Sequence, residues 1–310
     1  MNESPVISIV IPVFNEEGCI PPLCGRLTAV LATIGSPYEI IFSDDGSTDK
    51  SFAVIRELHQ KYPQVRGFSL SRNFGHQIAL LAGIKKAKGD IIITMDGDGQ
   101  HPAEFILSLL QKQKEGFDIV NTKRIDSDDK GLFKKISSAW FYSLINRLSD
   151  IAIEPASADF RLMNRKATDA FLSIPENDRF TRGLISWMGF SQAVLEYKEL
   201  PRSAGKTKYS FTKMMRFAIN GITSFSARPL RFSLYLGVLI AGFSVLYAIY
   251  AVMQFARGHV IPGWTSILVS VLFIGGSILI NMGIMGEYIA RIFTETKNRP
   301  LYFIKDQTPE

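Results

Sequence analysis

The chain of 310 residues is poor in cysteine and lacks the phosphate-binding turns of several large enzyme classes. Its two cysteines, Cys19 and Cys24, are too few for a disulfide framework, and they lack the second Cys or His pair of a zinc site. The first apolar run is not followed by a Gly-x-Gly-x-x-Gly turn, and no Walker A sequence occurs. These absences exclude a disulfide scaffold, a dinucleotide-binding turn and a P-loop, and we interpret both cysteines as chemically inert.

The N-terminal region does not have the pattern of a signal peptide. Its apolar run, Val6–Val13, is eight residues long, follows Glu3 rather than a basic segment, and lacks a small-residue cleavage site. We therefore expect the catalytic part, if the chain has one, to stay in the cytoplasm.

A large charge excess is also missing, since 35 Lys and Arg face 29 Asp and Glu, for a net charge of +6. The distribution is more informative: seven basic residues fall between Arg202 and Arg231, directly before a long hydrophobic segment. Nucleic-acid binding is disfavoured, because these basic residues do not lie among aromatics on a sheet face. Their position instead favours contact with a membrane surface.

The first ~120 residues alternate short apolar runs with longer amphipathic ones, which predicts a mostly parallel sheet with helices on both faces. The runs are rich in Ile and Val and are bounded by Gly, Pro, Asn or Asp. The expected strands are Val6–Val13, Glu39–Phe42, Val65–Leu70, Asp90–Met95 and Asp118–Thr122, and the expected helices cover residues 16–33, 48–61, 75–87 and 102–114. From about residue 121 the pattern is irregular, with a polar loop at Asp126–Gly131, a helix-like segment at Leu132–Leu148 and a short strand at Asp159–Met163.

The C-terminal third contains two long uncharged segments, Phe232–Phe255 with 24 residues and Trp264–Gly286 with 23. Each is long enough to cross a bilayer. Arg257 is the only Lys or Arg between them, whereas basic residues lie on both outer sides, so the positive-inside rule predicts a hairpin with both termini in the cytoplasm. Upstream, residues 209–227 have apolar side chains near helical spacing, which favours a helix in the membrane interface over a packed helix of the soluble domain.

Acidic side chains follow three successive predicted strands. Asp96-Gly97-Asp98 comes after the apolar run Ile91–Met95, Asp44 follows the second strand, and Glu16 lies just after the first. Ligands bind at the carboxyl ends of strands in open α/β sheets, and paired carboxylates there can share Mg²⁺ with a substrate's phosphates. A nucleotide with its metal would relieve the repulsion among these acids, whereas Asp-x-Asp alone also fits a solvated turn.

The ordered motifs of the chain resemble those of family-2 inverting glycosyltransferases with the GT-A fold. Within that family the chain is most similar to the polyprenyl-phosphate glycosyltransferases, which include bactoprenol glucosyltransferases and dolichol-phosphate mannose synthases. The motifs are Pro12–Glu16, Asp44–Ser47, Ser71–Gly75, Asp96-x-Asp98-x-Gln100-x-Pro102, Asp159–Met163, and Thr223–Ser226 leading to Pro229–Arg231 before the first hydrophobic segment. The resemblance implies a Rossmann-like α/β catalytic domain with a mostly parallel sheet and a C-terminal hairpin of two transmembrane helices.

The resemblance also implies roles for individual residues. The nucleoside would be held by Pro12, Phe14, Glu16 and Asp44, and Mg²⁺ or Mn²⁺ by Asp96, Asp98 and Gln100, with Asp98 also counted as catalytic. Phosphate would be contacted by Arg124, Arg202 and Lys208, and the acceptor phosphate and the sugar by the catalytic pair Asp159 and Arg161. His76, at a predicted helix start, is a weaker candidate for donor contact. Gly99 replaces a usual Leu and His101 stands where an acid is common, so loop rigidity and metal preference are open.

The resulting prediction is an inverting hexosyltransferase that moves glucose from UDP-glucose onto undecaprenyl phosphate at the bacterial inner membrane, with a homo-oligomer suited to the paired spans. Asp159 would act as a base or as an orienting group. One open alternative is transfer of another sugar to the same lipid, either mannose from GDP-mannose or a modified pentose from a UDP-pentose. A second is a processive polysaccharide synthase, which would need a Gln-x-x-Arg-Trp motif and more spans. A third is an inactive membrane scaffold. The expected parts are a catalytic domain (1–200), a basic juxtamembrane segment (201–231), two spans within 232–289, and a cytoplasmic tail (290–310).

Overall fold

The computed structural model describes residues 5–125, 157–177, 180–200, 226–258 and 263–309. Several sequence-based expectations fall outside these residues. They are the polar loop Asp126–Gly131, the helix-like segment Leu132–Leu148, the interfacial helix over most of residues 209–227, and the phosphate candidates Arg202 and Lys208.

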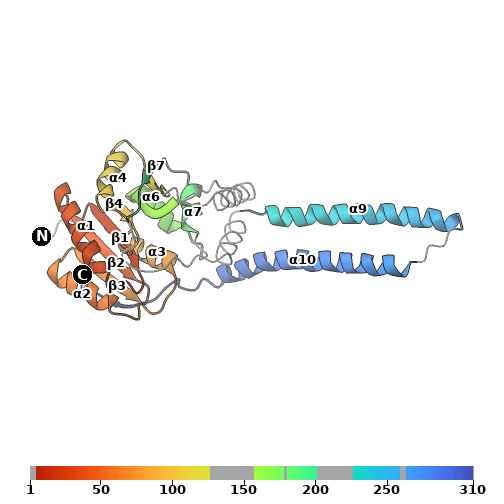
Figure 1. Cartoon of the computed structure of the whole chain (residues 1–310), viewed down its shortest axis with the longest axis horizontal. Helices are drawn as coiled ribbons and strands as arrows, with labels where there is room; N and C mark the ends of the chain where they lie inside the picture. The colour runs from red at the N-terminus through yellow and green to blue at the C-terminus, as the bar shows by residue number, and fades with distance from the viewer. Residues whose placement is uncertain (1–4, 126–156, 178–179, 201–225, 259–262, 310) are drawn as a thin grey trace.

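The α/β domain, which the sequence predicts to be catalytic, is built on an eight-stranded mixed sheet in the order β7-β5-β6-β4-β1-β2-β3-β8 (Figure 1). The parallel core consists of β1 (Ile7–Val13), β2 (Tyr38–Asp44), β3 (Val65–Leu70) and β4 (Ile91–Thr94). On one side, β6 (Ser157–Asn164) runs antiparallel between β4 and β5 (Ile119–Arg124), and β7 (Gln192–Tyr197) pairs parallel with β5. On the other side, β8 (Ile304–Gln307) is antiparallel to β3. The prediction of a mostly parallel α/β sheet is confirmed.

Helices cover both faces of the sheet, as the apolar runs predict. The helices are α1 (Ile20–Ile34), α2 (Ser51–Lys61), α3 (His76–Lys86), α4 (Phe105–Lys114), α6 (Arg165–Ser173) and α7 (Thr181–Trp187). One buried cluster joins α1, α2 and α4 to the sheet, and a second joins α3, α6 and α7. Alternation along β1 explains the two layers, because Ile9 and Ile11 belong to the first cluster and Val10 to the second.

Neither cysteine forms a disulfide, as the sequence predicts. Cys24 lies in the first buried cluster on α1, and both thiols are free. Burial raises the pKa of the Cys24 thiol to about 11, so it stays protonated near neutral pH.

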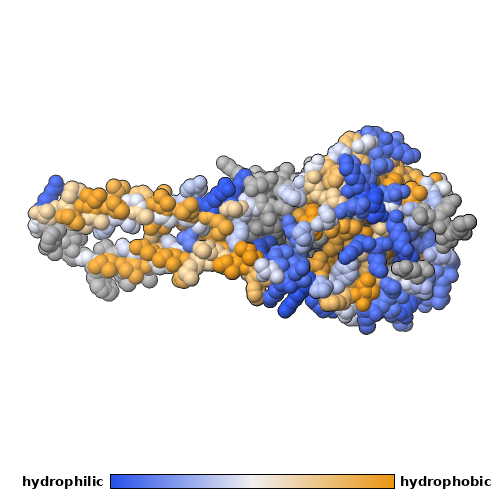
Figure 2. All heavy atoms as spheres, turned by 180° about the vertical axis from the view of Figure 1, so that it is seen from behind, coloured by the Kyte–Doolittle hydropathy of each residue, from blue (hydrophilic) through white to orange (hydrophobic). Residues whose placement is uncertain are grey.

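Two long helices project from the catalytic domain as a hairpin (Figure 1). They are α9 (Arg228–Ala256) and α10 (Trp264–Thr296), and each is long and apolar enough to cross a membrane. Apolar side chains line the exposed surfaces of both helices (Figure 2), which is the surface that a bilayer would cover. Each predicted span lies within one helix, but α10 continues beyond Gly286 to Thr296.

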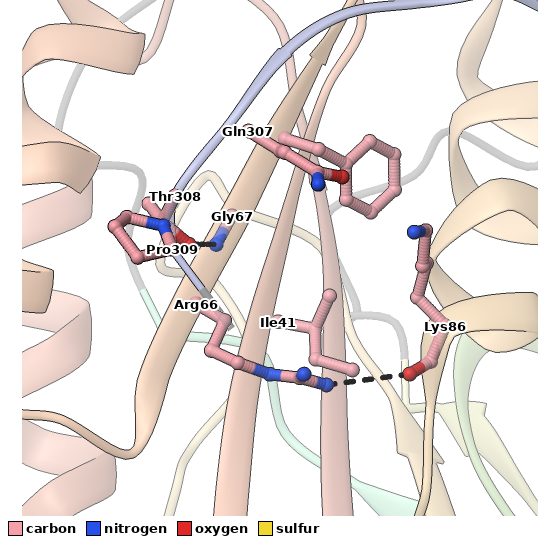
Figure 3. Close-up of a pocket in the computed structure, with 8 residues that line it drawn as sticks. Ile41, Arg66, Gly67, Lys86, Gln307, Thr308 and Pro309 are labelled. Carbon is pink, nitrogen blue, oxygen red and sulfur yellow. Dashed lines mark hydrogen bonds between the residues drawn. The ribbon is translucent and has the colours of Figure 1, made fainter.

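The C-terminal residues return to the catalytic domain instead of forming a plain tail. Strand β8 adds to the edge of the sheet, where the Thr308 amide donates to the Gly67 carbonyl over 2.8 Å and the Ser71 amide to the Phe303 carbonyl over 2.9 Å. Arg56 and Asp306 form an ion pair beside these bonds. Figure 3 shows a small pocket between the returning segment, β3 and the end of α3, where Arg66 donates to the Lys86 carbonyl. No pattern in the sequence predicts this strand.

Candidate active site

Those predicted site residues that the structure describes lie toward the carboxyl edge of the sheet. Strands β1, β2 and β4 are parallel, with Val13 opposite Asp44 and Val10 opposite Thr94, so the segments that follow them meet at this edge. Strands β5 and β7 run in the same direction, which places Arg124 and Tyr197 at this edge as well.

The nucleoside candidates lie at the ends of β1 and β2 and in the loop that follows β1. Phe14 is 43% exposed, whereas Pro12 within β1 is buried. Asp44 is fully buried, and its carboxylate accepts hydrogen bonds from the Ser47 amide over 3.1 Å and from the Ser69 hydroxyl over 2.5 Å. A carboxylate has about four acceptor positions, so these bonds orient Asp44 and leave acceptor capacity for a ligand.

The two loops are also joined to each other. The Asn15 side-chain oxygen accepts a bond from the Thr48 amide over 2.9 Å, and Asn15 has a positive φ of 56°. The Glu16 amide in turn donates to the Ser51 hydroxyl over 2.9 Å. These bonds hold Phe14 and half-buried Glu16 against the end of β2.

The Asp-x-Asp loop follows β4. Asp96 Oδ2 lies 3.0 Å from His101 Nε2, and Asp96 Oδ1 lies 3.3 Å from His76 Nε2. The Oδ1 atom is buried and, among the residues that the structure describes, has no hydrogen-bond partner. Asp98 Oδ1 accepts a bond from the Gln100 amide over 3.0 Å, which closes the turn.

Gly99, where the family resemblance implies a usual Leu, adopts a backbone conformation that a Leu would enter only with strain. Its φ is 74°, in the left-handed region that only glycine enters without strain. Its carbonyl accepts a bond from Arg26 Nη2 over 3.2 Å, and the neighbouring Gln100 carbonyl accepts one from the Leu200 amide over 2.9 Å. Contacts from α1 and from the segment after β7 therefore hold the loop, although it contains a glycine.

Asp159 lies on β6, beside the Asp-x-Asp strand. It is 6% exposed, and the Thr94 hydroxyl donates to its backbone carbonyl over 2.6 Å. Buried Arg161 donates to Asp159 Oδ1 over 2.9 Å, Gln77 donates to Oδ2 over 3.2 Å, and Arg182 Nε lies 3.3 Å from Oδ1. Burial alone would raise the pKa of Asp159, but Arg182, His76 and Arg161 together hold it well below its ordinary value.

His76 lies between the two halves of the site. Its Nε2 is 3.3 Å from Asp96 Oδ1 and 3.4 Å from Asp159 Oδ2. Burial opposes the charged imidazolium, but the hydrogen bond to Asp159 and the two nearby carboxylates raise the pKa of His76 above its ordinary value. The sequence suggested His76 only as a donor contact, and the structure places it next to both candidate acids.

The remaining described candidate, Arg124, ends β5. Its Nη1 donates to Glu199 over 2.7 Å, just beyond β7. Gln77, Arg182 and Tyr197 were not among the site residues predicted from the sequence, and His101 was noted only as a departure. His101 is one residue from Gln100, but no spacing in the sequence signals the other three.

The residues at Asp96, Asp98 and Gln100 fit a hard divalent cation. Two carboxylates and one amide could provide oxygen ligands, and Asp96 Oδ1 is a buried acceptor that makes no hydrogen bond within the described part of the chain, although His76 Nε2 lies 3.3 Å away. No group of three or more His, Cys, Asp or Glu side chains within those residues could hold a metal alone. A cation here would therefore complete its coordination with oxygens from substrate or water.

The family of the chain is now clear. The model of glycosyl transferase family 2 matches residues 8–172, and that of the GtrB C-terminal hairpin matches residues 228–292. The chain belongs to family 2 of the glycosyltransferases and is a hexosyltransferase, which confirms the resemblance seen in its motifs.

Several relatives match the chain over nearly their whole length. The chain is 42% identical to the uncharacterized glycosyltransferase YkcC of Bacillus subtilis, over 96% of this chain and 93% of the relative. It is 41% identical to the bactoprenol glucosyl transferase of Shigella phage SfII, over 96% of this chain and 97% of the relative. A more distant solved structure, the mannosyltransferase PcManGT from Pyrobaculum calidifontis with GDP-Man and Mn²⁺, is 14% identical with a TM-score of 0.46, covering 90% of this chain and 88% of that one.

Proposed function

We propose that the protein transfers glucose from UDP-glucose to undecaprenyl phosphate at the cytoplasmic face of a bacterial inner membrane. The observation that carries this proposal is the near full-length identity of about 40% to bactoprenol glucosyl transferases, hairpin included. The catalytic unit would be residues 1–200, followed by the basic segment 201–231, the hairpin within 232–289 and the segment 290–310. Strand β8 in this last segment belongs to the same sheet as β1, which supports the placement of both termini on the same side of the membrane.

The donor would lie across the carboxyl ends of β1, β2 and β4. Phe14 would offer an exposed ring for the base, and Glu16 and Asp44 would offer acceptors for its hydrogen-bond donors. Asp96, Asp98 and Gln100 would hold Mg²⁺ or Mn²⁺, which when bound offsets the negative charge that develops on the departing diphosphate.

Asp159 would orient the acceptor side rather than remove a proton. The phosphate of a polyprenyl phosphate is already anionic near neutral pH, so its oxygen can attack without a strong base. Arg161 and Arg182 keep Asp159 ionised, and they place positive charge where a second phosphate must approach. Arg124, Arg202 and Lys208 would add to this charge. In-line attack at the anomeric carbon inverts it and gives a β-linked product from an α-linked donor.

The test is a donor screen with the purified full-length protein, undecaprenyl phosphate, and Mg²⁺ or Mn²⁺, with lipid-linked sugar as the product measured. We expect turnover with UDP-glucose, and turnover only with GDP-mannose or a UDP-pentose would reassign the sugar. Failure with every UDP- and GDP-sugar would contradict the transferase reaction itself.

Asp98→Ala separates catalysis from a scaffold role. The variant should lose nearly all turnover, because it removes a carboxylate of the candidate metal pair. Asp90→Ala is the matched control, since Asp90 is an exposed acid just before β4, at the opposite end of the strand, and its loss should leave turnover unchanged. A cellular role that survives Asp98→Ala would favour an inactive scaffold, and long polymer products would favour a processive synthase.

The hairpin would also suit a small homo-oligomer. Its apolar surfaces are exposed along both helices, and lipid or a second hairpin would cover them. Native mass spectrometry from mild detergent measures the subunit number, and a uniform monomer would contradict this part of the proposal.

A further inference from the structure

We propose that His101 and Tyr197 are positioning residues that hold Asp96 Oδ2, so that Asp96 Oδ1 remains directed to the divalent cation. This inference rests on the metal-dependent transfer proposed above. Neither residue would touch the substrate. Both would act through the first carboxylate of the Asp-x-Asp pair.

The three side chains form a continuous hydrogen-bonded series. His101 Nε2 lies 3.0 Å from Asp96 Oδ2, and the Tyr197 hydroxyl lies 2.9 Å from His101 Nδ1. The His101 side chain is 3% exposed, and Tyr197 is also buried. The bond between Tyr197 and His101 is therefore shielded from bulk water, which makes its geometry more restrictive than that of a surface pair, whereas the Asp96 side chain is 34% exposed.

The order of the series fits the tautomer of His101 that carries a proton on Nε2. If the Tyr197 hydroxyl donates to Nδ1, then Nε2–H is the group that faces and donates to Asp96 Oδ2. In the other neutral tautomer, the lone pair of Nε2 would face the carboxylate, which is unfavourable. Burial raises the pKa of Tyr197, so its hydroxyl keeps the proton that this arrangement needs.

Aromatic packing fixes the ring of His101 in this orientation. The His101 ring centroid lies 4.9 Å from that of Phe160 and 5.5 Å from that of Tyr197, and Phe160 meets Tyr197 edge to face at 5.8 Å. Phe160 follows Asp159 directly on β6. The same cluster thus supports the metal loop and the strand that carries the acceptor-side acid.

The two carboxylate oxygens of Asp96 have different surroundings, and the hydrogen-bonded series would keep them in these two positions. Oδ2 is held by His101, whereas Oδ1 is buried and makes no hydrogen bond within the described chain, with His76 Nε2 3.3 Å away. Without a donor on Oδ2, the carboxylate would turn about its χ2 bond and present either oxygen to the cation. Groups that orient ligands in this way typically change metal affinity by about 10- to 100-fold.

Four variants test the proposal in the full-length protein. His101→Phe keeps an aromatic ring but has no donor, His101→Gln restores an N–H near the position of Nε2, and Tyr197→Phe removes only the hydroxyl. His59→Gln is the matched control, because His59 on α2 bonds the Val65 carbonyl, away from the Asp-x-Asp loop. The readout is equilibrium binding of Mn²⁺ in the presence of UDP, followed by the electron paramagnetic resonance signal of free Mn²⁺.

We expect His101→Phe to weaken Mn²⁺ binding by about 10- to 100-fold and Tyr197→Phe by several-fold, and His101→Gln to recover most of the affinity. ¹⁵N NMR should show the Nε2–H tautomer of His101 in the wild type. The chain has only four histidines, so the His101 resonance can be assigned as the one that is absent from the spectrum of His101→Phe. Wild-type affinity in His101→Phe, or the Nδ1–H tautomer in the wild type, would overturn the proposal. Mn²⁺ binding is measured without sugar transfer, so failure of this proposal can be distinguished from failure of the donor screen, which would contradict the transferase reaction.

Discussion

At the scale of single residues, Asp159 is the most heavily constrained side chain of the candidate site. Donors reach it from three elements: Arg161 on β6, His76 and Gln77 on α3, and Arg182 on α7. The Asp159 carboxylate neutralises the positive charge of buried Arg161, and Arg161 and Arg182 stabilise the negative charge of the carboxylate. The arrangement suits an orienting carboxylate, because its protonation near neutral pH would be unfavourable.

Asp159→Asn should therefore destabilise the protein as well as stop turnover. The change leaves Arg161, which is 2% exposed, without its anion, and an uncompensated buried charge typically costs about 3–5 kcal/mol. A lowered thermal unfolding midpoint of the full-length protein in detergent measures the effect. Asp169→Asn is the control, since Asp169 is 62% exposed in its pair with Arg165 and should matter little. Equal midpoints for both variants would contradict the assigned role.

The second prediction for a single residue concerns the stability of variants at Gly99. Gly99→Ala and Gly99→Leu should each cost about 1–2 kcal/mol, because both place a Cβ in the left-handed conformation at φ 74°. Gly99→Asn should cost less, since Asn tolerates this region. Gly25→Ala on α1, where an added Cβ meets nothing within 4 Å, is the control and should be neutral or stabilising. Thermal unfolding measures all four, and a Leu variant as stable as wild type would mean that the loop has another accessible conformation.

Prediction from sequence succeeded for residues whose position follows from strand direction. Asp44, Asp96 and Asp98 follow parallel strands, so strand order alone predicts that they share one edge of the sheet. Tyr197 could not be placed in this way, because it meets His101 across 96 positions of sequence. That contact depends on β6 inserting antiparallel between β4 and β5, which no local pattern encodes.

At the scale of elements, the start of α3 is positioned by the turn after β2. Asp45 is buried, and its carboxylate accepts bonds from the Phe74 amide over 2.8 Å and from the Gly75 amide over 2.9 Å. Gly75 has a φ of 101°, which directs the chain into the helix. His76 and Gln77 then lie in the first turn of α3, where both reach Asp159.

Asp45→Ala should lower turnover by about 10- to 100-fold through displacement of that first helical turn. The measurement is the transfer rate at saturating donor, together with hydrogen exchange at the Gly75 amide, which should become faster. Asp49→Ala is the control on the same loop, because Asp49 bonds the amides of Ser51 and Glu17 rather than the start of α3. Unchanged exchange at Gly75 in Asp45→Ala would show that the turn is held by other contacts.

Strand β8 was not predicted, and its sequence explains why. The segment Ile304–Gln307 is only four residues long and carries Lys305 and Asp306, so it has neither the length nor the apolar alternation of a typical strand. It forms because the edge of β3 offers unpaired backbone groups.

Removal of residues 303–310 should expose the edge of β3. We expect much faster hydrogen exchange at the Gly67 and Ser71 amides, whose acceptors are Thr308 Oγ1 and the Phe303 carbonyl. Increased self-association should accompany it, because an open edge can pair with another chain. Thr308→Val is the matched control, since it removes only the acceptor for Gly67 and should leave Ser71 protected. Unchanged protection at both amides after truncation would mean that β8 does not cover this edge.

At the scale of the whole molecule, the end of α10 is tied to the catalytic domain by the main chain and by side-chain contacts. After α10 the chain returns to the sheet as β8, and Glu295 near the end of α10 accepts bonds from Asn177. At the base of the hairpin, the Tyr288 hydroxyl donates to the Ser226 carbonyl over 2.7 Å, which joins α10 to the start of α9. The sequence predicted the two spans from their lengths and lack of charge, but not these connections. They matter for the proposed function, in which a membrane-bound acceptor would react only if the site is held at the right height and angle above the bilayer.

The contact between Glu295 and Asn177 allows that idea to be tested. Glu295 accepts three hydrogen bonds of 3.0 Å from the amide and the side chain of Asn177, which ties the end of α10 to the segment after α6. Glu295→Ala should lower turnover several-fold with undecaprenyl phosphate in liposomes, but not with a short-chain polyprenyl phosphate in detergent, because the soluble acceptor reaches the site without bilayer placement. Glu287→Ala, an exposed acid on the same helix, is the control and should behave as wild type with both acceptors. An equal loss with both acceptors would mean that Glu295 stabilises the fold, and no loss with either would mean that the other connections suffice to orient the domain.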